Sequence, residues 1–438
     1  MSLLSYPEYK DSGVTWLGEV PAHWRASKTK HVCQFTTGWT PPTGDASAYE
    51  GENLWANISD LGERTIYDTA KRISDIAALQ AGIELTPQGG LLFSFKLSIG
   101  QVSFAGRPMY TNEAIASFRE SPNLSLAYAY YAFPLFLVKN AAENIYGAKL
   151  LNQELIRGAT ICLPRVEEQT AIATFLDRET AKIDALIAEQ EKLLTLLAEK
   201  RQATISHAVT KGLNPDAPMK DSGVEWLGGV PAHWRITRLK YATDLIVDCP
   251  HETPNYDENG LYKVIRTADV TEGKLDSSKM YSVTEAEFLN RIRRQSLVKD
   301  DIVYGREGER WGFAAIVPED GKYCLGQRMM QFRVASATCP RYLMWQLNSV
   351  STYRQGQLDT VGSTSPHVNV GTIRNYALAE PPYEEQQKIT EFLDAETTRL
   401  DALTTEATRA IDLLKERRTA LISAAVTGKI DVREAVEC

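Results

Sequence analysis

The chain has 438 residues, of which 43% are hydrophobic and 24% charged, and its formal net charge is −8. This length is too great for a single hydrophobic core and predicts two to four domains. The longest apolar run, residues 126–138, contains Pro134 and is too short to cross a membrane.

The six cysteines are scattered, and no two of them form a C-x-x-C pair. The sequence therefore predicts neither a zinc site nor a disulfide framework. The first residues, MSLLSYPEYKD, lack the basic and apolar parts of a secretory signal. We expect a reduced, cytoplasmic protein that uses no metal and no cofactor.

The first recognisable segment is residues 11–25, DSGVTWLGEVPAHWR, which returns as residues 221–235, DSGVEWLGGVPAHWR. Each copy places two tryptophans beside Gly and Pro turns. Aromatic residues in such places are more often packing anchors than ligand-stacking residues. We interpret both segments as clamps that fasten a domain to the end of a helix.

A first β-rich domain follows, because residues 26–165 show short β-like runs separated by turn signals. The runs are Asn53–Ser59, Leu91–Phe95, Gln101–Ala105 and Ile115–Phe118. One helix is predicted over residues 124–142. A second domain, residues 236–382, repeats this plan with little sequence identity. Its predicted strands are Leu261–Arg266, Asp301–Gly305, Gly312–Val317 and Met330–Val334, with a helix over residues 341–353.

Each domain is followed by a long helical pattern, residues 166–213 and residues 383–430, and the two patterns match at a constant offset of 217. Neither has an internal Pro or Gly before its end, so each predicts one continuous helix of about 40 residues. The apolar stripes predict a coiled-coil seam. The predicted seam residues are Ile172, Leu176, Ile183, Leu186, Leu193 and Leu197, and Ile389, Leu393, Leu400, Leu403, Leu414 and Leu421.

Charge on the predicted seam favours an antiparallel pair. Glu179 and Glu396 occupy matching positions, as do Lys200 and Arg417. A parallel, in-register pair would set like charges against each other, whereas an antiparallel pair brings acidic ends toward basic ends.

The repeat predicts an α+β fold in which two mixed α/β domains are separated by two long antiparallel coiled-coil helices, with pseudo-two-fold internal symmetry. The predicted boundaries are a clamp at 1–25, a domain at 26–165, a helix at 166–213, a clamp at 214–235, a domain at 236–382, a helix at 383–432 and a tail at 433–438.

With these segments in place, the chain resembles the specificity subunits of type I restriction-modification systems. The matching motifs are the PAHW clamps, the helix starts LPRVEEQ and EPPYEEQ, and the two E-K/R-R-x-x-x-I-S helix ends. The openings of the two domains, residues 37–61 and 248–270, also resemble target recognition domains. The resemblance implies a non-catalytic subunit whose domains each read half of a split DNA sequence. It also implies, as partners, double-stranded DNA, two modification (methyltransferase) subunits and restriction (translocase and nuclease) subunits.

Regional charge is compatible with DNA binding despite the acidic total. Residues 26–165 hold 12 basic and 12 acidic side chains, and residues 236–382 hold 18 of each. The acidic excess therefore lies in the helices and clamps, which we do not expect to lie along phosphates.

Arginine suits bidentate contact with guanine or phosphate, and short polar side chains in loops also read base edges. In the first domain we predict DNA contacts from Thr36, Thr37, Trp39, Ser94, Lys96, Ser98, Gln101 and Asn152. In the second we predict Arg266, Arg291, Arg293, Arg294, Arg306, Arg310, Arg328, His367 and Asn369.

Two rival functions are considered. Residues 380–383, EPPY, resemble the D/N-P-P-Y/F tetrapeptide of adenine methyltransferases, but no glycine-rich cofactor loop precedes them, and we interpret them as a helix start. A fused methyltransferase or nuclease would be the enzyme alternative. A coiled-coil scaffold whose β-rich domains bind ligands other than DNA would be the other.

Overall fold

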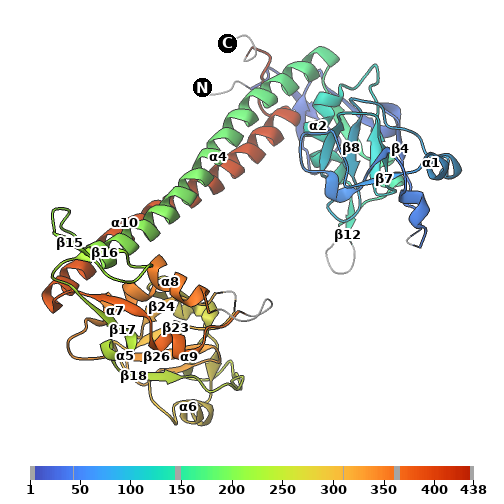
Figure 1. Ribbon diagram of the computed structural model, residues 1–438. Coiled ribbons are helices and arrows are strands. Elements are labelled where there is room, and N and C mark those ends of the chain that lie inside the picture. The colour runs from blue at the N-terminus through green and yellow to red at the C-terminus, as the bar shows by residue number, and fades with distance from the viewer. Residues whose placement is uncertain (1–4, 43, 144–148, 309, 360–365, 435–438) are drawn as a thin grey trace. The chain divides into compact units, whose positions relative to one another are not determined.

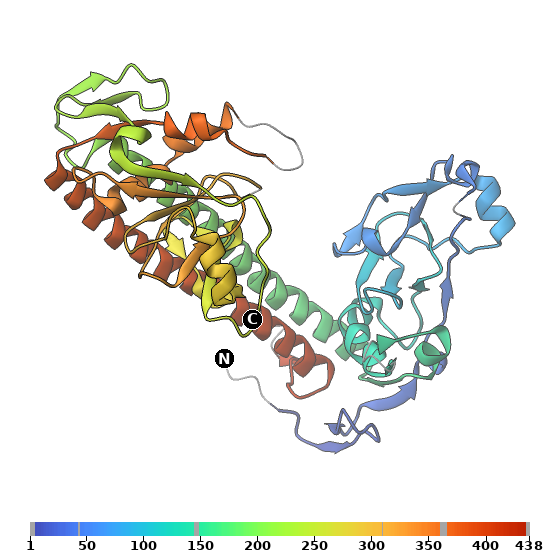
Figure 2. The same ribbon diagram turned by 90° about the horizontal axis from the view of Figure 1, so that it is seen from below.

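The computed structural model describes residues 5–42, 44–143, 149–308, 310–359 and 366–434 (Figures 1 and 2). The chain divides into two compact units, residues 1–189 with 410–438, and residues 190–409. Each unit contains a clamp, a β-rich domain and the adjoining parts of the two long helices. The long helices are α4 (Val166–Lys211) and α10 (Tyr383–Val426).

The main sheet of the first unit has five strands. In spatial order they are β4 (Phe35–Thr37), β11 (Ile115–Phe118), β8 (Leu91–Ser94), β9 (Val102–Ala105) and β6 (Thr65–Ile66). All neighbours are antiparallel except β6 and β9. Every residue of β8 and β11 is buried, which explains why neither strand contains a charged residue. Helix α2 (Leu126–Lys139) contacts β8 and β9 and covers the sheet (Figure 1).

A smaller sheet completes the first domain. It consists of β10 (Tyr110–Thr111), β5 (Asn53–Ala56) and β7 (Lys71–Ile73), followed in the chain by α1 (Asp75–Ala81). The remaining elements are two-stranded pairs and one short helix. They are β1 (Tyr9–Asp11) with β2 (Glu19–Pro21), β3 (Arg25–Lys28) with β14 (Thr160–Leu163), β12 (Ala142–Glu143) with β13 (Lys149–Leu150), and α3 (Gln153–Gly158).

The second unit repeats the main features of this topology, although among the described residues its main sheet has no counterpart of β6. Its main sheet has the order β18 (Thr243–Asp248), β26 (Met329–Val334), β23 (Ile302–Gly305) and β24 (Ala314–Ile316). Its smaller sheet has the order β22 (Ser282–Val283), β19 (Tyr262–Ile265) and β25 (Tyr323–Leu325), and α6 (Glu285–Arg291) follows β22 in the chain. The other pairs are β15 (Met219–Asp221) with β16 (Gly229–Pro231), β17 (Arg235–Arg238) with β27 (Ala377–Glu380), and β20 (Val270–Thr271) with β21 (Lys274–Leu275). Helices α5 (Leu239–Ala242), α7 (Pro340–Leu347), α8 (Val350–Gln357) and α9 (Val370–Arg374) complete it.

All eight strands predicted from the sequence are present, within two or three residues at their ends. The predicted helix over residues 341–353 is wrong in one respect, because α7 ends before Asn348 and α8 begins a new helix. The break has a local cause. The side chain of Asn348 pairs with the backbone of Ala314, and Ser349 caps α8 by accepting a hydrogen bond from the backbone N–H of Thr352.

Helices α4 and α10 pack together in antiparallel orientation (Figures 1 and 2). In the first unit Arg418 of α10 contacts Asp184 of α4 at 2.8 Å. In the second unit Arg201 of α4 contacts Asp401 of α10 at 3.0 Å. The two ion pairs are equivalent under the 217-residue repeat, and a parallel in-register pair would set Arg201 against Arg418 instead.

The residues proposed for the seam were partly wrong. Leu186, Leu193 and Leu403 are 46%, 40% and 41% exposed, while the next residues, Ile187 and Leu194, are more buried. Lys200 and Arg417 are likewise exposed, and the arginines that follow them make the ion pairs instead.

The buried positions of the two helices follow steps of three or four residues and include two threonines. Thr180 and Thr397 are 3% and 4% exposed, and each hydroxyl donates to the carbonyl four residues earlier, Leu176 or Leu393. These hydroxyls are satisfied within their own helix, so a polar residue occupies a core position without loss of a hydrogen bond. A seam predicted from apolar residues alone omits both threonines, and some of the positions predicted after them are displaced by one residue.

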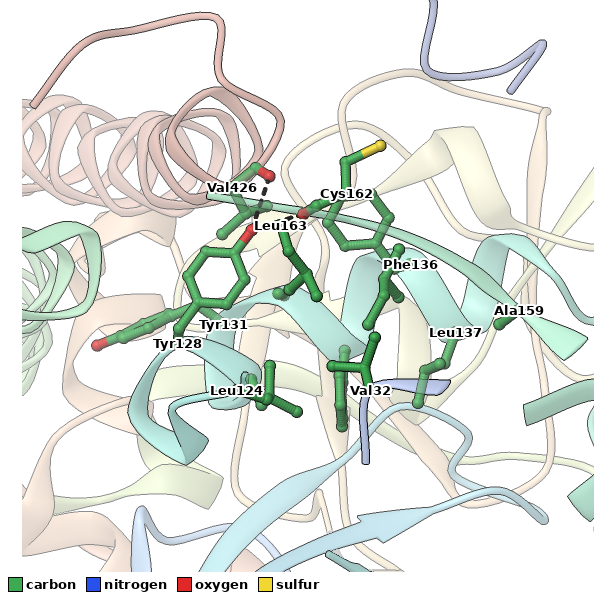
Figure 3. Close-up of a cluster of buried hydrophobic side chains, with 14 of the residues drawn as sticks. Val32, Leu124, Tyr128, Tyr131, Phe136, Leu137, Ala159, Cys162, Leu163 and Val426 are labelled. Carbon is green, nitrogen blue, oxygen red and sulfur yellow. Dashed lines mark hydrogen bonds between the residues drawn. The ribbon is translucent and has the colours of Figure 1, made fainter. Parts of the chain in front are cut away.

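Each domain is held to the long helices by the same hydrogen bonds. Tyr128 of α2 is fully buried, and its hydroxyl lies 3.2 Å from the carbonyl oxygens of Cys162 in β14 and Val426 at the end of α10 (Figure 3). In the second unit the hydroxyl of Tyr342 lies 3.0 Å from the carbonyl oxygen of Ala379 and 3.4 Å from that of Val209. Thus each tyrosine connects the strand that precedes one long helix to the end of the other long helix.

The clamps lie against these same helix ends. Trp24 is fully buried, and its indole N–H donates to Glu168 in the first turn of α4, which also accepts a hydrogen bond from Tyr6. In the second unit Trp234 is fully buried beside Gly212, and His233 contacts Glu385 in the first turn of α10 at 2.8 Å. Glu385 lies two residues after the EPPY tetrapeptide, whose Glu380 ends β27 and whose Tyr383 begins α10.

Within the described ranges, no helix combines the length and the apolar composition that a membrane span requires.

Candidate DNA interface

Four segments of the first domain meet at one end of its main sheet. The strand register sets the end of β4, the start of β11 and the end of β8 side by side, because Thr37 pairs with Ala116 and Ser94 pairs with Ile115. The start of α3 joins them, since the amide of Gln153 donates to the hydroxyl of Thr37 at 3.0 Å. These segments line a surface hollow of about 370 Å³. Its lining residues are Thr37, Phe95, Lys96, Glu113, Asn152, Gln153 and Glu154.

Three of the predicted residues, Thr37, Lys96 and Asn152, therefore come together from distant parts of the sequence. Lys96, Ser98, Gln101 and Asn152 are exposed, and the Asn152 side chain also caps α3 by accepting from the backbone N–H of Leu155. Thr36 and Trp39 are half-buried.

Ser94 does not fit a direct contact. It is fully buried, and its hydroxyl donates to the carbonyl of Lys96 at 3.0 Å. The structure therefore gives Ser94 a supporting position beneath the β8–β9 loop, because no face of its side chain remains open to a ligand.

The second domain brings the corresponding four segments together. The guanidinium of Arg306, just after β23, contacts Asp248 at the end of β18 at 3.0 Å and donates to the carbonyl of Val368, ahead of α9, at 3.4 Å. The backbone N–H of Arg328, ahead of β26, lies 3.1 Å from the sulfur of Cys249. The backbones of His367 and Glu307 form an isolated antiparallel β-bridge.

The predicted arginines of the second domain fall into two groups. Arg293, Arg294, Arg310 and Arg328 are exposed. Arg291 and Arg306 are only 5% and 7% exposed and are committed to the interior.

Arg291 shows what the buried arginines do. Its guanidinium donates to the carbonyls of Leu325 at 2.6 Å, Glu252 at 3.1 Å and Pro250 at 3.4 Å. It therefore holds the 250–252 loop against β25 and is not available to a base or phosphate, since three of its donor nitrogens already have acceptors. The sequence could not distinguish this arginine from its exposed neighbours, Arg293 and Arg294.

Arg266 is half-buried and also strongly paired. It contacts the buried carboxylate of Asp269 at 2.7 Å, and its guanidinium carbon lies 3.7 Å from the ring centroid of Tyr281. The hydrogen bond to Asp269 raises the pKa of Arg266 above its usual value. Asn369 is exposed at the start of α9, where its amide donates to Asp359 at 3.1 Å.

Several side chains at these faces were missed by sequence reasoning. Glu113, Gln153 and Glu154 line the hollow of the first domain. In the second domain Thr253 donates to Gln327 at 3.0 Å, which links two of the loops, and His251 contacts Asp248 at 3.0 Å. None of the contacts predicted from the sequence is a carboxylate, although carboxylates also read DNA by accepting from the amino group of cytosine.

Among the residues that the structure describes, no three His, Cys, Asp or Glu side chains are grouped as a metal site would require. The five described cysteines are free thiols. Burial raises the pKa of Cys33 to about 12 and that of Cys162 to about 11, so both thiols stay protonated at neutral pH.

Known protein families match this chain in two separate segments, one in each half. Residues 21–195 and 248–412 both match the family described as type I restriction modification DNA specificity domain. The chain is 22% identical to the type I restriction enzyme MjaIX specificity subunit of Methanocaldococcus jannaschii, over 98% of this chain and 97% of that protein. It is 20% identical to the EcoKI specificity subunit of Escherichia coli, over 66% of this chain and 61% of that protein.

Two solved structures have a similar fold. The HsdS subunit from Thermoanaerobacter tengcongensis aligns with a TM-score of 0.54 at 16% identity, covering 94% of this chain and 98% of that one. A chain from a study of the assembly and conformational transition of the type I R-M system aligns with a TM-score of 0.65 at 16% identity, covering 93% and 98%. The matched residues span most of the chain, in two copies, and the chain belongs to the type I restriction-modification DNA specificity family.

Proposed function

We propose that each domain reads one half of a split DNA target with the four-segment face at the end of its main sheet. The observation that carries this proposal is that the face recurs in both domains on one topology, while the side chains on it differ. A repeated frame with divergent side chains is what two related readers of different base sequences require.

The charge distribution supports these faces as the places of contact. Arg328 is exposed on the face of the second domain, where its backbone N–H meets Cys249, and Lys96 is exposed on the face of the first. The long helices, the clamps and the tail together hold 26 acidic and 18 basic side chains, so these segments would repel a phosphate backbone. On this basis Thr37, Lys96, Ser98, Gln101 and Asn152 are the contacts proposed for the first domain. Those for the second are Arg293, Arg294, Arg310, Arg328 and His367.

The chain supplies recognition rather than chemistry in this proposal. Its relatives are named as specificity subunits of restriction enzymes. We infer that methyltransferase and restriction subunits join this chain in the cytoplasm and carry out adenine methylation and cleavage at the sites it selects. The paired helices α4 and α10 would then set the spacing between the two half-sites.

The first experiment determines the target and its division. The chain is expressed with its methyltransferase partner in a host without other adenine methylation, and the methylated sequence is read by methylation-aware sequencing. Residues 26–165 are then replaced by the corresponding domain of another family member. We expect one half of the methylated sequence to change and the other half to remain. A change in both halves would show that the domains do not read independently.

The reciprocal exchange, of residues 236–382, serves as the matched control. It should alter the other half only. Proper folding of each hybrid is checked by co-purification with the methyltransferase subunit before methylation is scored.

A further inference from the structure

Leu97, at the tip of the β8–β9 loop, has two unusual properties together. It is 91% exposed, and its φ is +57°, in the left-handed region that β-carbon-bearing residues disfavour. A single exposed leucine is ordinary on a protein surface. A leucine held in this conformation is not, and backbone strain of this kind gathers at functional sites.

Hydrogen bonds and packing contacts hold the loop around Leu97. The N–H of Ile99 donates to the carbonyl of Leu97, and the N–H of Gly100 donates to the carbonyl of Ser94, both at 2.9 Å. The buried hydroxyl of Ser94 fixes the carbonyl of Lys96 from below. Gly100 is seated against Val138 of α2, where a β-carbon would come within 2.9 Å. The loop therefore holds Leu97 outward, and nothing in its position depends on a flexible hinge.

The second domain has glycine at the corresponding place. Gly308 follows β23 as Leu97 follows β8, and its φ is +88°. Gly308 is buried, and its N–H donates to the carbonyl of Pro366 at 2.8 Å. Glycine adopts this conformation without strain. The first domain thus carries a projecting apolar side chain where its sister domain carries none.

The neighbours of Leu97 indicate what it meets. Lys96 and Ser98 on either side are exposed, and Lys96 also lines the hollow with Thr37 and Asn152. A cation and a hydroxyl on either side of an exposed leucine could bind a ligand that has anionic groups on its outside and apolar surfaces stacked inside. Stacked base pairs have this character, and leucine is one of the apolar side chains that proteins insert between base steps.

We propose that Leu97 is a wedge that inserts between two stacked base pairs of the half-site read by the first domain. This inference rests on the proposed function and adds to it a residue that deforms the DNA. Insertion would transfer the leucine side chain out of water, and the preformed loop would keep the ordering cost low. The second half-site would be read without such a wedge.

The test uses the full chain in complex with its methyltransferase partner and a duplex carrying the sequence that this complex methylates. The fluorescent base 2-aminopurine, which is quenched by stacking, replaces one base at a time across both half-sites. We expect a fluorescence increase at one base step of a single half-site, separate from the methylated adenine. Leu97→Asn should abolish this signal and weaken binding by about tenfold, because the buried apolar side chain is lost. Leu97→Met should retain both.

Stability provides an independent readout. Asparagine tolerates the left-handed conformation better than leucine, so Leu97→Asn should unfold at a temperature about 2–4 °C higher than the parent. Loss of DNA binding in a protein that is more stable cannot be attributed to misfolding. The matched control is Leu79→Gln, which removes a leucine that is 83% exposed on α1 of the same unit, and it should leave the DNA signal unchanged.

Each other outcome contradicts the wedge. If the complex binds the duplex but no fluorescence change depends on Leu97, the wedge is wrong. It is also wrong if Leu97→Asn loses the methyltransferase subunit while the DNA signal stays intact, because Leu97 would then contact a protein. If the parent complex shows no salt-dependent binding to the duplex it methylates, the proposed function itself fails, and the wedge falls with it.

Discussion

Tyr128 and Tyr342 make the same connection in the two units. Each hydroxyl lies within hydrogen-bond distance of two carbonyl oxygens, one at the edge of its domain and one at the end of a long helix (Figure 3). Val426 and Val209 are among the last residues of their helices, where carbonyls have no partner within the helix. The tyrosines therefore complete the helix ends and hold the domains to them.

We predict that Tyr128→Phe and Tyr342→Phe each lower the free energy of unfolding by about 1–3 kcal/mol, because each removes the hydroxyl donor from a buried carbonyl. Urea unfolding followed by circular dichroism measures this. The control is Tyr67→Phe, since Tyr67 is 64% exposed and its change should stay within about 0.5 kcal/mol. Equal stability of Tyr128→Phe and the parent would mean that the hydroxyl does not hold the helix end.

At the scale of the elements, the long helices combine a continuous seam with two ion pairs in equivalent positions. Asp184 with Arg418, and Arg201 with Asp401, satisfy each other only when the helices run in opposite directions. Arg201 is also bound by Glu272 of the second domain at 3.0 Å, which connects the seam to that domain. The ion pairs therefore select orientation, while the apolar seam supplies most of the stability.

This arrangement allows a test of the proposed spacing function. We predict that one extra heptad in each helix, a duplicate of residues 184–190 in α4 and of residues 405–411 in α10, preserves the seam. It lengthens both helices by about 10 Å. If the helices set the spacing, the gap between half-sites should grow by about three base pairs at 3.4 Å each, with the specified bases unchanged.

Methylation-aware sequencing of a host expressing this variant measures the gap. A variant with the heptad in α4 alone is the control, because its seam is out of register and its helical content should fall. If the double insertion methylates the original spacing as efficiently as the parent, the helices do not act as the spacer.

At the scale of the whole molecule, the two units share one topology and one set of helix-end contacts. A partner that recognises a helix end and its clamp in one unit therefore finds an equivalent surface in the other. We predict that two methyltransferase subunits join each chain. Native mass spectrometry of the co-purified complex should give a two-to-one ratio, and a one-to-one complex that persists under excess partner would contradict the equivalence.

The contacts at the two helix starts are not identical, and this difference gives a second test of how the two methyltransferase subunits bind. Glu168 accepts from Tyr6 and Trp24 and contacts His23, whereas Glu385 contacts His233. If the clamps form part of the partner surface, the two methyltransferase subunits should dissociate at different concentrations on dilution, which mass photometry can follow.

The sequence alone determined the repeat, the two β-rich domains, the long helices and their antiparallel pairing. These features depend on local patterns: strand-length apolar runs, an unbroken helical period and a constant offset of 217 residues. The family resemblance also followed from contiguous motifs, and the matched residues confirmed it.

Only the tertiary structure decided which residues lie on the seam and which arginines are exposed. Thr180 and Thr397 are polar in the sequence but satisfied within their own helices. Arg291 is a cation whose three acceptors come from two distant backbone segments, β25 and the 250–252 loop. The role proposed for Leu97 rests on a backbone angle that no sequence pattern reports. Burial and hydrogen bonding between distant residues set these outcomes, because a side chain's availability depends on what the fold brings next to it.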